Sequence, residues 1–300
     1  MAEAIRKGNY RGIYFMLASA FSFALMGAIT KLLGADLGAI QLVFFRNLFG
    51  VLFIGLTLFR RPIRQEGGRP WLLIFRGVVG TLALYAFFYN ITTISLGEAV
   101  TFSQTSPIFI ALFSGLLLKE RLHKYGWLSI GLGFAAILCI FRPEASALSL
   151  KSNLIGLFCG VGTALAYLSI RELKKRYDTR SVVLSFMASG LVLPLLSALL
   201  GRVIDPARYD YIAARFVYPH LHQWPWILLL GVTALAGQVF LTKAYGEEKA
   251  GIVSSIGYSN IVFSVLLGVL LGDPFPDGSS LAGIALIIAG GVLISLKKEE

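Results

Sequence analysis

Apolar residues run through this chain in long blocks that are separated by short polar or charged stretches. A bilayer core about 30 Å thick needs ~20 mostly apolar residues in a helix, with ~17 tolerated. Ten blocks meet or approach that length, so the pattern predicts an all-α integral membrane protein with ten transmembrane helices. The predicted spans are residues 12–34, 39–58, 71–93, 97–118, 126–141, 153–171, 181–200, 225–246, 250–272 and 280–296.

The longest connection, residues 201–224, reads GRVIDPARYDYIAARFVYPHLHQW. Tyr209, Ile212 and Phe216 recur there at helical spacing, which predicts a short helix on the membrane surface. The polar N-terminus leads into an apolar run that has no small-residue cleavage site. We therefore interpret that run as a retained first span rather than a signal peptide.

Composition supports lipid as the solvent. The 300 residues are 56% hydrophobic and only 14% charged, with a mean hydropathy of +0.75. A soluble chain holds about a quarter of its residues as charges. The net charge of +11 would favour nucleic acid in a soluble protein. Here it indicates anchoring at the cytoplasmic face of a membrane, and no nucleic-acid partner is expected.

Lysine and arginine are distributed unevenly between the two sets of connections. With the N-terminus in the cytoplasm, 18 of the 27 lie inside and five outside. The positive-inside rule therefore predicts an inner-membrane protein with both termini in the cytoplasm. The inside residues are Arg6, Lys7, Arg11, Arg60, Arg61, Arg64, Arg69, Lys119, Arg121, Lys124, Arg171, Lys174, Lys175, Arg176, Arg180, Lys249, Lys297 and Lys298; those outside are Arg142, Lys151, Arg202, Arg208 and Arg215.

The chain repeats itself. TSPIFIALFSGLLLKERL (105–122) aligns without gaps on YSNIVFSVLLGVLLGDPF (258–275), which puts Ser106 over Ser259. The start of each half also corresponds, since GIYFMLASAFSFA resembles GLFCGVGTALAYL. Each half holds five spans, and an odd number means that the second copy enters from the opposite side. Residues 9–145 and 150–297 are thus predicted to be inverted repeats, although two membrane helices can share such patterns by chance.

A longer stretch resembles a known family. RGVVGTLALYAFFYNITTISLGEAVTFSQTSPIFIALFSGLLLKERL is similar to the third and fourth helices of the EamA branch of the drug/metabolite transporter superfamily. The shared features are an Arg-Gly opening, a polar fourth helix with a proline, and an acidic residue before a basic loop. The resemblance implies a carrier of small metabolites that works by alternating access. Asn260 and Gly272-Asp273-Pro274 depart from the family's usual Pro and Gly-Glu.

Inverted repeats point to the same mechanism, because they give a bundle two nearly equal packings around a midplane site. The fourth span is polar around most of its circumference. Its hydroxyls, Ser106 among them, either line a path or bond to the preceding turn and hold helices together. Gln104 cannot satisfy its amide so locally, which favours a cavity role. Pro107 should bend the helix, either to free a carbonyl near mid-bilayer or as a static kink.

Two further spans carry polar groups at helical spacing. In the ninth, Ser254 and Tyr258 form a stripe that Asn260 follows, and in the third, Asn90 shares a face with Arg76. Tyr85 and Tyr89 lie on the other side of the third span; such aromatic stripes are more often packing, although each hydroxyl needs a partner. The small-residue faces of the first and sixth spans indicate close helix packing: Ala20, Ala24 and Ala28; Gly156, Gly160 and Ala164.

Four cations and one acid fall inside predicted spans. Lys31 and Arg76 lie near span ends, where snorkelling to headgroups is the favoured interpretation. Lys243 has Glu247 one turn away as a candidate partner. Arg46 is farther from both loops, so it either contacts substrate or binds helix-end carbonyls. Glu98 lies near the outer end of the fourth span, where a solvated carboxylate is favoured over a proton-coupling site.

The chain contains no phosphate loop, nucleophile elbow or His-Glu-x-x-His helix, so no enzyme is predicted. His220 and His222 lack a third ligand nearby, and Cys139 and Cys159 sit in apolar runs. No metal or other cofactor is expected.

The predicted function is a secondary transporter of small anionic or zwitterionic metabolites, such as amino acids or organic acids. The alternatives are a carrier of cationic or aromatic compounds (nucleoside-like, vitamin-like or drug-like) and a non-transporting sensor or assembly subunit. The expected partners are the lipid bilayer and a small substrate, with a coupling proton or ion left open. The candidate substrate-binding residues are Arg46, Tyr85, Tyr89, Asn90, Gln104, Ser106, Gln238, Lys243, Tyr258 and Asn260, and the gating or coupling candidates are Arg76, Glu98 and Pro107.

Overall fold

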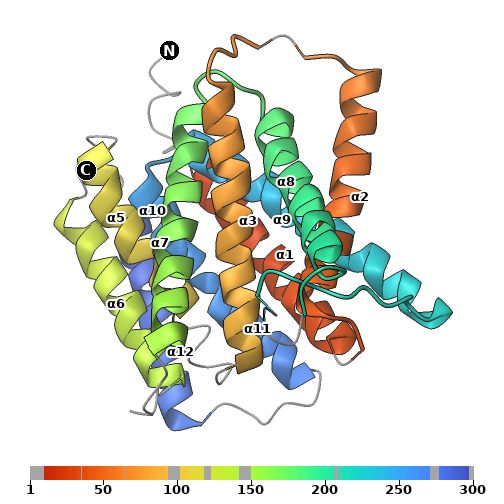
Figure 1. Cartoon of the computed structure of the whole chain (residues 1–300). Helices are drawn as coiled ribbons and strands as arrows, with labels where there is room; N and C mark the ends of the chain where they lie inside the picture. The colour runs from red at the N-terminus through yellow and green to blue at the C-terminus, as the bar shows by residue number, and fades with distance from the viewer. Residues whose placement is uncertain are drawn as a thin grey trace.

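The computed structural model describes residues 10–34, 36–63, 65–93, 102–117, 123–141, 150–205, 209, 211–270 and 277–296. Throughout these ranges the regular structure is helical, and no strand occurs in them (Figure 1). The α-helices are α1 (Arg11–Leu33), α2 (Ala39–Arg60), α3 (Pro70–Thr93), α5 (Ser106–Leu117), α6 (Lys124–Phe141), α7 (Leu150–Leu173), α8 (Thr179–Leu200), α9 (Trp224–Glu247), α10 (Ala250–Gly257), α11 (Ser259–Leu270) and α12 (Gly278–Leu296); η1 (Leu221–Gln223) is a short 3₁₀ helix.

Seven helical stretches among the described residues are long and apolar enough to cross a membrane, and three shorter apolar helices accompany them. The prediction of an all-helical membrane protein is therefore confirmed, while the count of ten crossings stays a prediction. Many large apolar side chains face outward, such as Phe59 and Trp71, which are 87% and 80% exposed. Apolar surface on this scale is rare on soluble monomers and is expected where the solvent is lipid.

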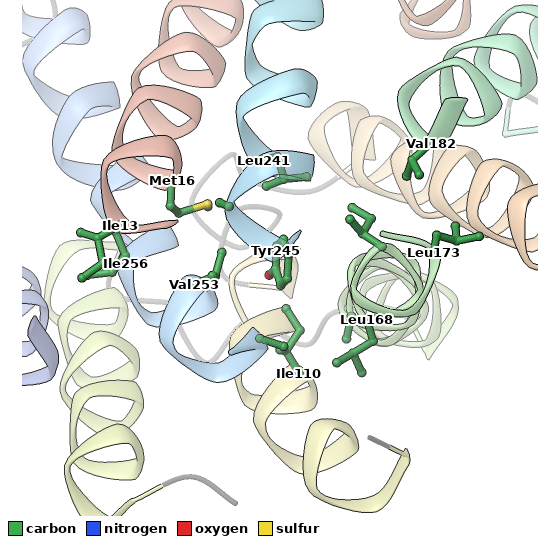
Figure 2. Packing of buried hydrophobic residues seen from close by; sticks show 14 of the residues in the cluster. Ile13, Met16, Ile110, Leu168, Leu173, Val182, Leu241, Tyr245, Val253 and Ile256 are labelled. Atoms are coloured by element: carbon green, nitrogen blue, oxygen red, sulfur yellow. The ribbon is translucent and has the colours of Figure 1, made fainter. Parts of the chain in front are cut away.

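Helices from the two halves of the chain pack against one another. α1 lies along α9, α2 along α8, and α3 along both α7 and α8, while α6 and α12 pair at one side of the bundle (Figure 1). Six helices contribute to one buried cluster, in which Tyr245 of α9 lies among Ile110, Leu168 and Val253 (Figure 2). The predicted small-residue face of α7 is confirmed, because a side chain at Gly156 or Gly160 would collide with Phe102 or Thr105.

The predicted fourth and ninth spans are both interrupted, which corrects the expectation of continuous helices. α5 begins at Ser106 after a turn, and α11 begins at Ser259 after Tyr258 ends α10. The gapless alignment places these two helix starts over each other, so both halves break at the same position. Pro107 consequently stands in the first turn of α5, where a missing N–H removes no helical bond. The expected mid-helix bend at this proline is wrong.

Some hydroxyls beside these breaks donate to the preceding turn of their own helix. This is the second of the two alternatives that the sequence left open for them. Thr105 Oγ1 donates to the carbonyl of Phe102 at 2.6 Å. Ser254 and Ser255 both donate to the carbonyl of Gly251 at 3.0 Å. These groups satisfy themselves within one helix, and they need no ligand.

The segment 201–223 forms no helix in its described part before η1, which contradicts the predicted surface helix. Its backbone instead bonds to neighbouring helices. The Gln41 amide donates to the carbonyl of Val217 at 2.6 Å and accepts from the Val217 N–H at 3.0 Å. Ala214 N–H donates to the Ser197 carbonyl at 3.1 Å. These partners on α2 and α8 satisfy an extended chain, so the helical spacing of its apolar residues does not decide its structure.

At the opposite end of the bundle, the loop after α2 is hydrogen-bonded to the start of α8 and to the residues just before it. Ser181 donates to Oε1 of Gln65 at 2.9 Å, and the backbone N–H of Arg69 donates to the Tyr177 hydroxyl at 3.0 Å. Asp178 caps α8 by accepting from the backbone N–H of Arg180 at 2.9 Å. Burial alone would raise the pKa of Asp178, but the hydrogen bonds from Arg180 lower it below the ordinary value.

Candidate functional site

Two arginines from neighbouring helices are buried at one aromatic ring. Arg46 of α2 is 3% exposed, and Arg76 of α3 is 1% exposed. Their guanidinium carbons lie 5.9 and 4.4 Å from the ring centroid of Phe186 on α8. An aromatic face attracts a cation most strongly away from water, but a ring cannot neutralise a charge. We call Arg46 and Arg76 the arginine pair.

Arg76 does not snorkel, which corrects the interpretation favoured for it from the sequence. Nη1 of Arg76 lies 2.4 Å from where a Cβ on Gly80 would stand. Gly80 is one turn farther from the start of α3, so the side chain runs along the helix toward the middle of the span. The absence of a side chain at Gly80 provides the space for the guanidinium. Nη2 then donates to Oε1 of Gln238 on α9 at 3.1 Å.

Much of the donor capacity of the pair is unused. Nε of Arg46, and Nε and Nη1 of Arg76, are buried without a hydrogen-bond partner among the described residues. No carboxylate of the described residues forms an ion pair with either side chain. A buried unpaired donor costs about 1–3 kcal/mol, and more when it is charged. A group that supplied negative oxygens here would remove several such penalties together.

The surroundings of Arg76 combine aromatic and polar groups. Its guanidinium carbon lies 5.9 Å from the ring centroid of Tyr167 on α7, and that ring lies 5.5 Å from the ring of Tyr245. Thr242, one turn from Gln238 on α9, has a buried hydroxyl to which no described residue is hydrogen-bonded. This arrangement suits a small organic molecule, because the rings can cover its apolar part while arginine, glutamine and threonine bind its polar part.

Comparison with known proteins identifies the family of this chain. The pattern of the EamA-like transporter family matches residues 10–142 and again residues 150–296, which together make up most of the chain. The chain belongs to the EamA-like transporter family. The resemblance seen in the third and fourth spans is thereby confirmed.

Curated relatives of this EamA-like chain are transporters. An uncharacterized transporter of Helicobacter pylori strain J99 is 36% identical over 289 residues, covering 95% of this chain and 94% of the relative. The pseudopaline exporter CntI of Pseudomonas aeruginosa is 33% identical, covering 96% of this chain and 97% of its own. An S-adenosylmethionine uptake transporter of Rickettsia bellii is 21% identical over 96% of this chain and 94% of its own.

One solved crystal structure shares the fold. It superimposes with a TM-score of 0.78 at 19% sequence identity, covering 96% of this chain and 98% of the other. The likeness supports the arrangement of helices described above.

Three other candidates of the EamA-like chain lie toward the end of the bundle that carries residues 201–223. The Tyr85 hydroxyl pairs with Ser197 Oγ at 3.2 Å, which ties α3 to α8. Asn90 is 1% exposed, and neither amide atom of its side chain has a hydrogen-bond partner in the part of the chain that the structure describes. The ring of Tyr89 packs edge-on against Tyr211 at 5.8 Å, with Lys151 over both rings.

The candidates in the interrupted helices are spread over several elements. Gln104 is half-buried in the turn before α5, whose first residue, Ser106, is buried. Asn260 donates to the Ala20 carbonyl of α1 at 2.8 Å, so it links α11 to α1. The ring of Tyr258 belongs to a cluster with α6 and α12 that lies against Gly133.

Two charged candidates remain, Lys243 and Glu98. Nζ of Lys243 lies 5.3 Å from the ring centroid of Phe15 on α1, so its described contact is aromatic. Glu98 falls outside the described residues.

Sequence reasoning missed Phe186, Tyr167, Thr242 and Tyr245 around the arginine pair. All four stand within long apolar blocks and break no local rule, so nothing at their own positions marks them. The available signal was indirect, since a buried arginine needs aromatic or polar neighbours from other spans.

Proposed function

We propose that this chain is a secondary transporter that moves small organic anions or zwitterions across the membrane by alternating access. The observation that carries the proposal is the arginine pair, which is buried at one ring without a described carboxylate. Guanidinium stays charged at neutral pH and matches carboxylate or phosphate oxygens with parallel donors. In this proposal Arg46 and Arg76 bind the anionic group, and Gln238 holds Arg76 in place.

Two features of the fold support alternating access. Both halves break their helix at the same aligned position, and transporters commonly build midplane sites from such discontinuous helices. α1, α2 and α3 pair with helices of the other half, so relative movement of the halves would change the surroundings of the arginine pair. We propose accordingly that residues 9–145 and 150–297 are inverted five-helix repeats forming ten spans.

The proposed orientation follows from charge. The loops 61–69 and 174–180, rich in arginine and lysine, would face the cytoplasm of a cell whose inner membrane holds the protein. Residues 201–223 would lie outside, and both termini would be cytoplasmic.

A second set of contacts would act away from the arginine pair. Asn90 offers an unsatisfied amide near the outer end of α3, and Tyr85 and Tyr89 border it on the same helix. Gln104, Ser106, Tyr258 and Asn260 flank the two helix breaks, where a change of packing would move them most. Lys243 would contribute to the same positive environment, and Glu98 and Pro107 would take part in gating.

The alternative of a cationic substrate is disfavoured by the same pair, because a cation would meet two buried positive charges. The relatives include an exporter and an uptake transporter. Direction of transport therefore differs within the family, and we propose none for this chain.

Transport by the full-length protein in liposomes tests the proposal. A panel of amino acids and organic acids would first give a transported compound. Arg46→Gln should then fold and express nearly as the parent does, yet abolish uptake, because the amide removes the charge and the fork of donors. Arg202→Gln, an exposed arginine after α8, is the matched control and should leave uptake unchanged. Normal uptake by Arg46→Gln, or a cation as the transported compound, would overturn the proposal.

A further inference from the structure

We infer that the arginine pair binds two negative charges on one molecule, so the substrate class is a small dianion with two carboxylates on a short chain. The inference rests on the proposed function and narrows it. A carrier of anions in general needs only one cationic contact.

Charge balance is the first argument. Arg46 and Arg76 face the same ring, and their like charges repel each other. A ligand with one carboxylate would leave one of the two cations uncompensated in a low-dielectric site. A dianion neutralises both at once, and the site then closes without a buried net charge.

Distance is the second argument. Because the two guanidinium carbons lie 5.9 and 4.4 Å from one centroid, they are at most about 10 Å apart. A charge-assisted hydrogen bond of about 2.8 Å places a carboxylate directly beside each guanidinium. The carboxyl carbons of succinate lie about 4 Å apart when its three C–C bonds of ~1.5 Å are extended, and those of glutarate about 5 Å. Acids of this length can therefore reach both cations at once.

The distribution of free donors is the third argument. Unpartnered buried nitrogens occur on both arginines rather than on one: Nε of Arg46, and Nε and Nη1 of Arg76. Gln238 already occupies part of the Arg76 guanidinium and leaves the rest to a ligand. The ring of Phe186, which both guanidinium groups approach, can cover the methylene chain between two carboxylates.

The test compares acids of similar length and unequal charge on the purified full-length protein. Thermal unfolding would be followed in detergent at matched ionic strength with succinate, glutarate, monomethyl succinate and butyrate. The dicarboxylates should stabilise the protein at concentrations at least about tenfold lower than the two monoanions, as expected when a second charged contact is made. Arg46→Gln and Arg76→Gln should each abolish that difference, whereas Arg202→Gln should keep it.

Each result decides the inference separately from the proposed function. Equal potency of succinate and monomethyl succinate overturns the inference that the substrate is a dianion. Uptake that depends on Arg46 would still support the proposed carrier of anions. Failure of all four acids to stabilise the parent also overturns it, and the proposed function then stands or falls on the liposome assay. If a Gln variant does not fold, Arg→Lys at the same position keeps the charge and removes the fork. Such a variant should retain part of the preference for dicarboxylates.

Discussion

Gly80→Ala should displace the guanidinium of Arg76 while it leaves the fold largely intact. The added Cβ would stand 2.4 Å from Nη1 of Arg76 and 3.0 Å from the ring of Phe186. The first contact is with the far end of a flexible side chain, so the guanidinium must move by roughly 1 Å to reach ordinary contact near 3.4 Å. A shift of that size away from Gln238 would take Nη2 out of hydrogen-bond range, since the bond now measures 3.1 Å.

Two free-energy contributions of this substitution have opposite signs. Replacing glycine by alanine inside a helix stabilises by about 0.5–1 kcal/mol, which offsets the crowding at Phe186. Loss of a hydrogen bond that involves a charged group costs about 1.5–3 kcal/mol. At 1.4 kcal/mol for each factor of ten, we expect substrate affinity to fall roughly 10- to 150-fold. The Gln238 bond also forms without substrate, so its loss lowers the stability of the fold too, and the melting temperature should fall by only a few degrees.

Uptake kinetics in liposomes and thermal unfolding in detergent would be measured on the same preparations. Gly55→Ala in α2 is the matched control, because a Cβ there meets nothing within 4 Å. It should leave the apparent affinity unchanged. Parent-like affinity in Gly80→Ala would refute the argument that Gly80 positions Arg76. A large fall in melting temperature would show that crowding at Phe186 dominates instead.

Three further predictions concern the two ends of the bundle. A cysteine at Glu66 should be protected from an impermeant reagent applied outside, and one at Tyr218, which is fully exposed, should react; the reverse pattern would invert the topology. Gln41→Leu should speed hydrogen exchange at Val217 and destabilise the protein by about 1–3 kcal/mol, because it removes both bonds to that residue; unchanged exchange there would contradict the role given to Gln41. Asp178→Ala should cost about 1 kcal/mol of stability through loss of the α8 cap. Since the folded pKa of Asp178 is lowered, its contribution is present above its ordinary pKa of 3.8 and is lost as the pH falls through the lower folded value, so parent and variant should unfold alike in strong acid.

Much of the helical layout follows from hydropathy because lipid imposes a length on every apolar block. The helix breaks do not, since the residues around Gln104 and Tyr258 are compatible with a continuous helix until tertiary contacts are known. The direction of Arg76 likewise depends on Gly80, Phe186 and Gln238 acting together, and two of these stand on other helices. Distance from the end of a span is therefore a weak guide to whether an arginine snorkels.

The pairing of helices across the two halves also has a consequence for synthesis. α9, which lies along α1 and holds Arg76 through Gln238, leaves the ribosome long after α1 to α3. At about 5–20 residues per second, the delay is on the order of ten to forty seconds. Until α8 and then α9 follow, the membrane holds two arginines without the ring or the amide that later surround them, each costing ~3 kcal/mol near the bilayer centre. The N-terminal half made alone should therefore be degraded by membrane quality control, and co-expression of the C-terminal half should rescue it.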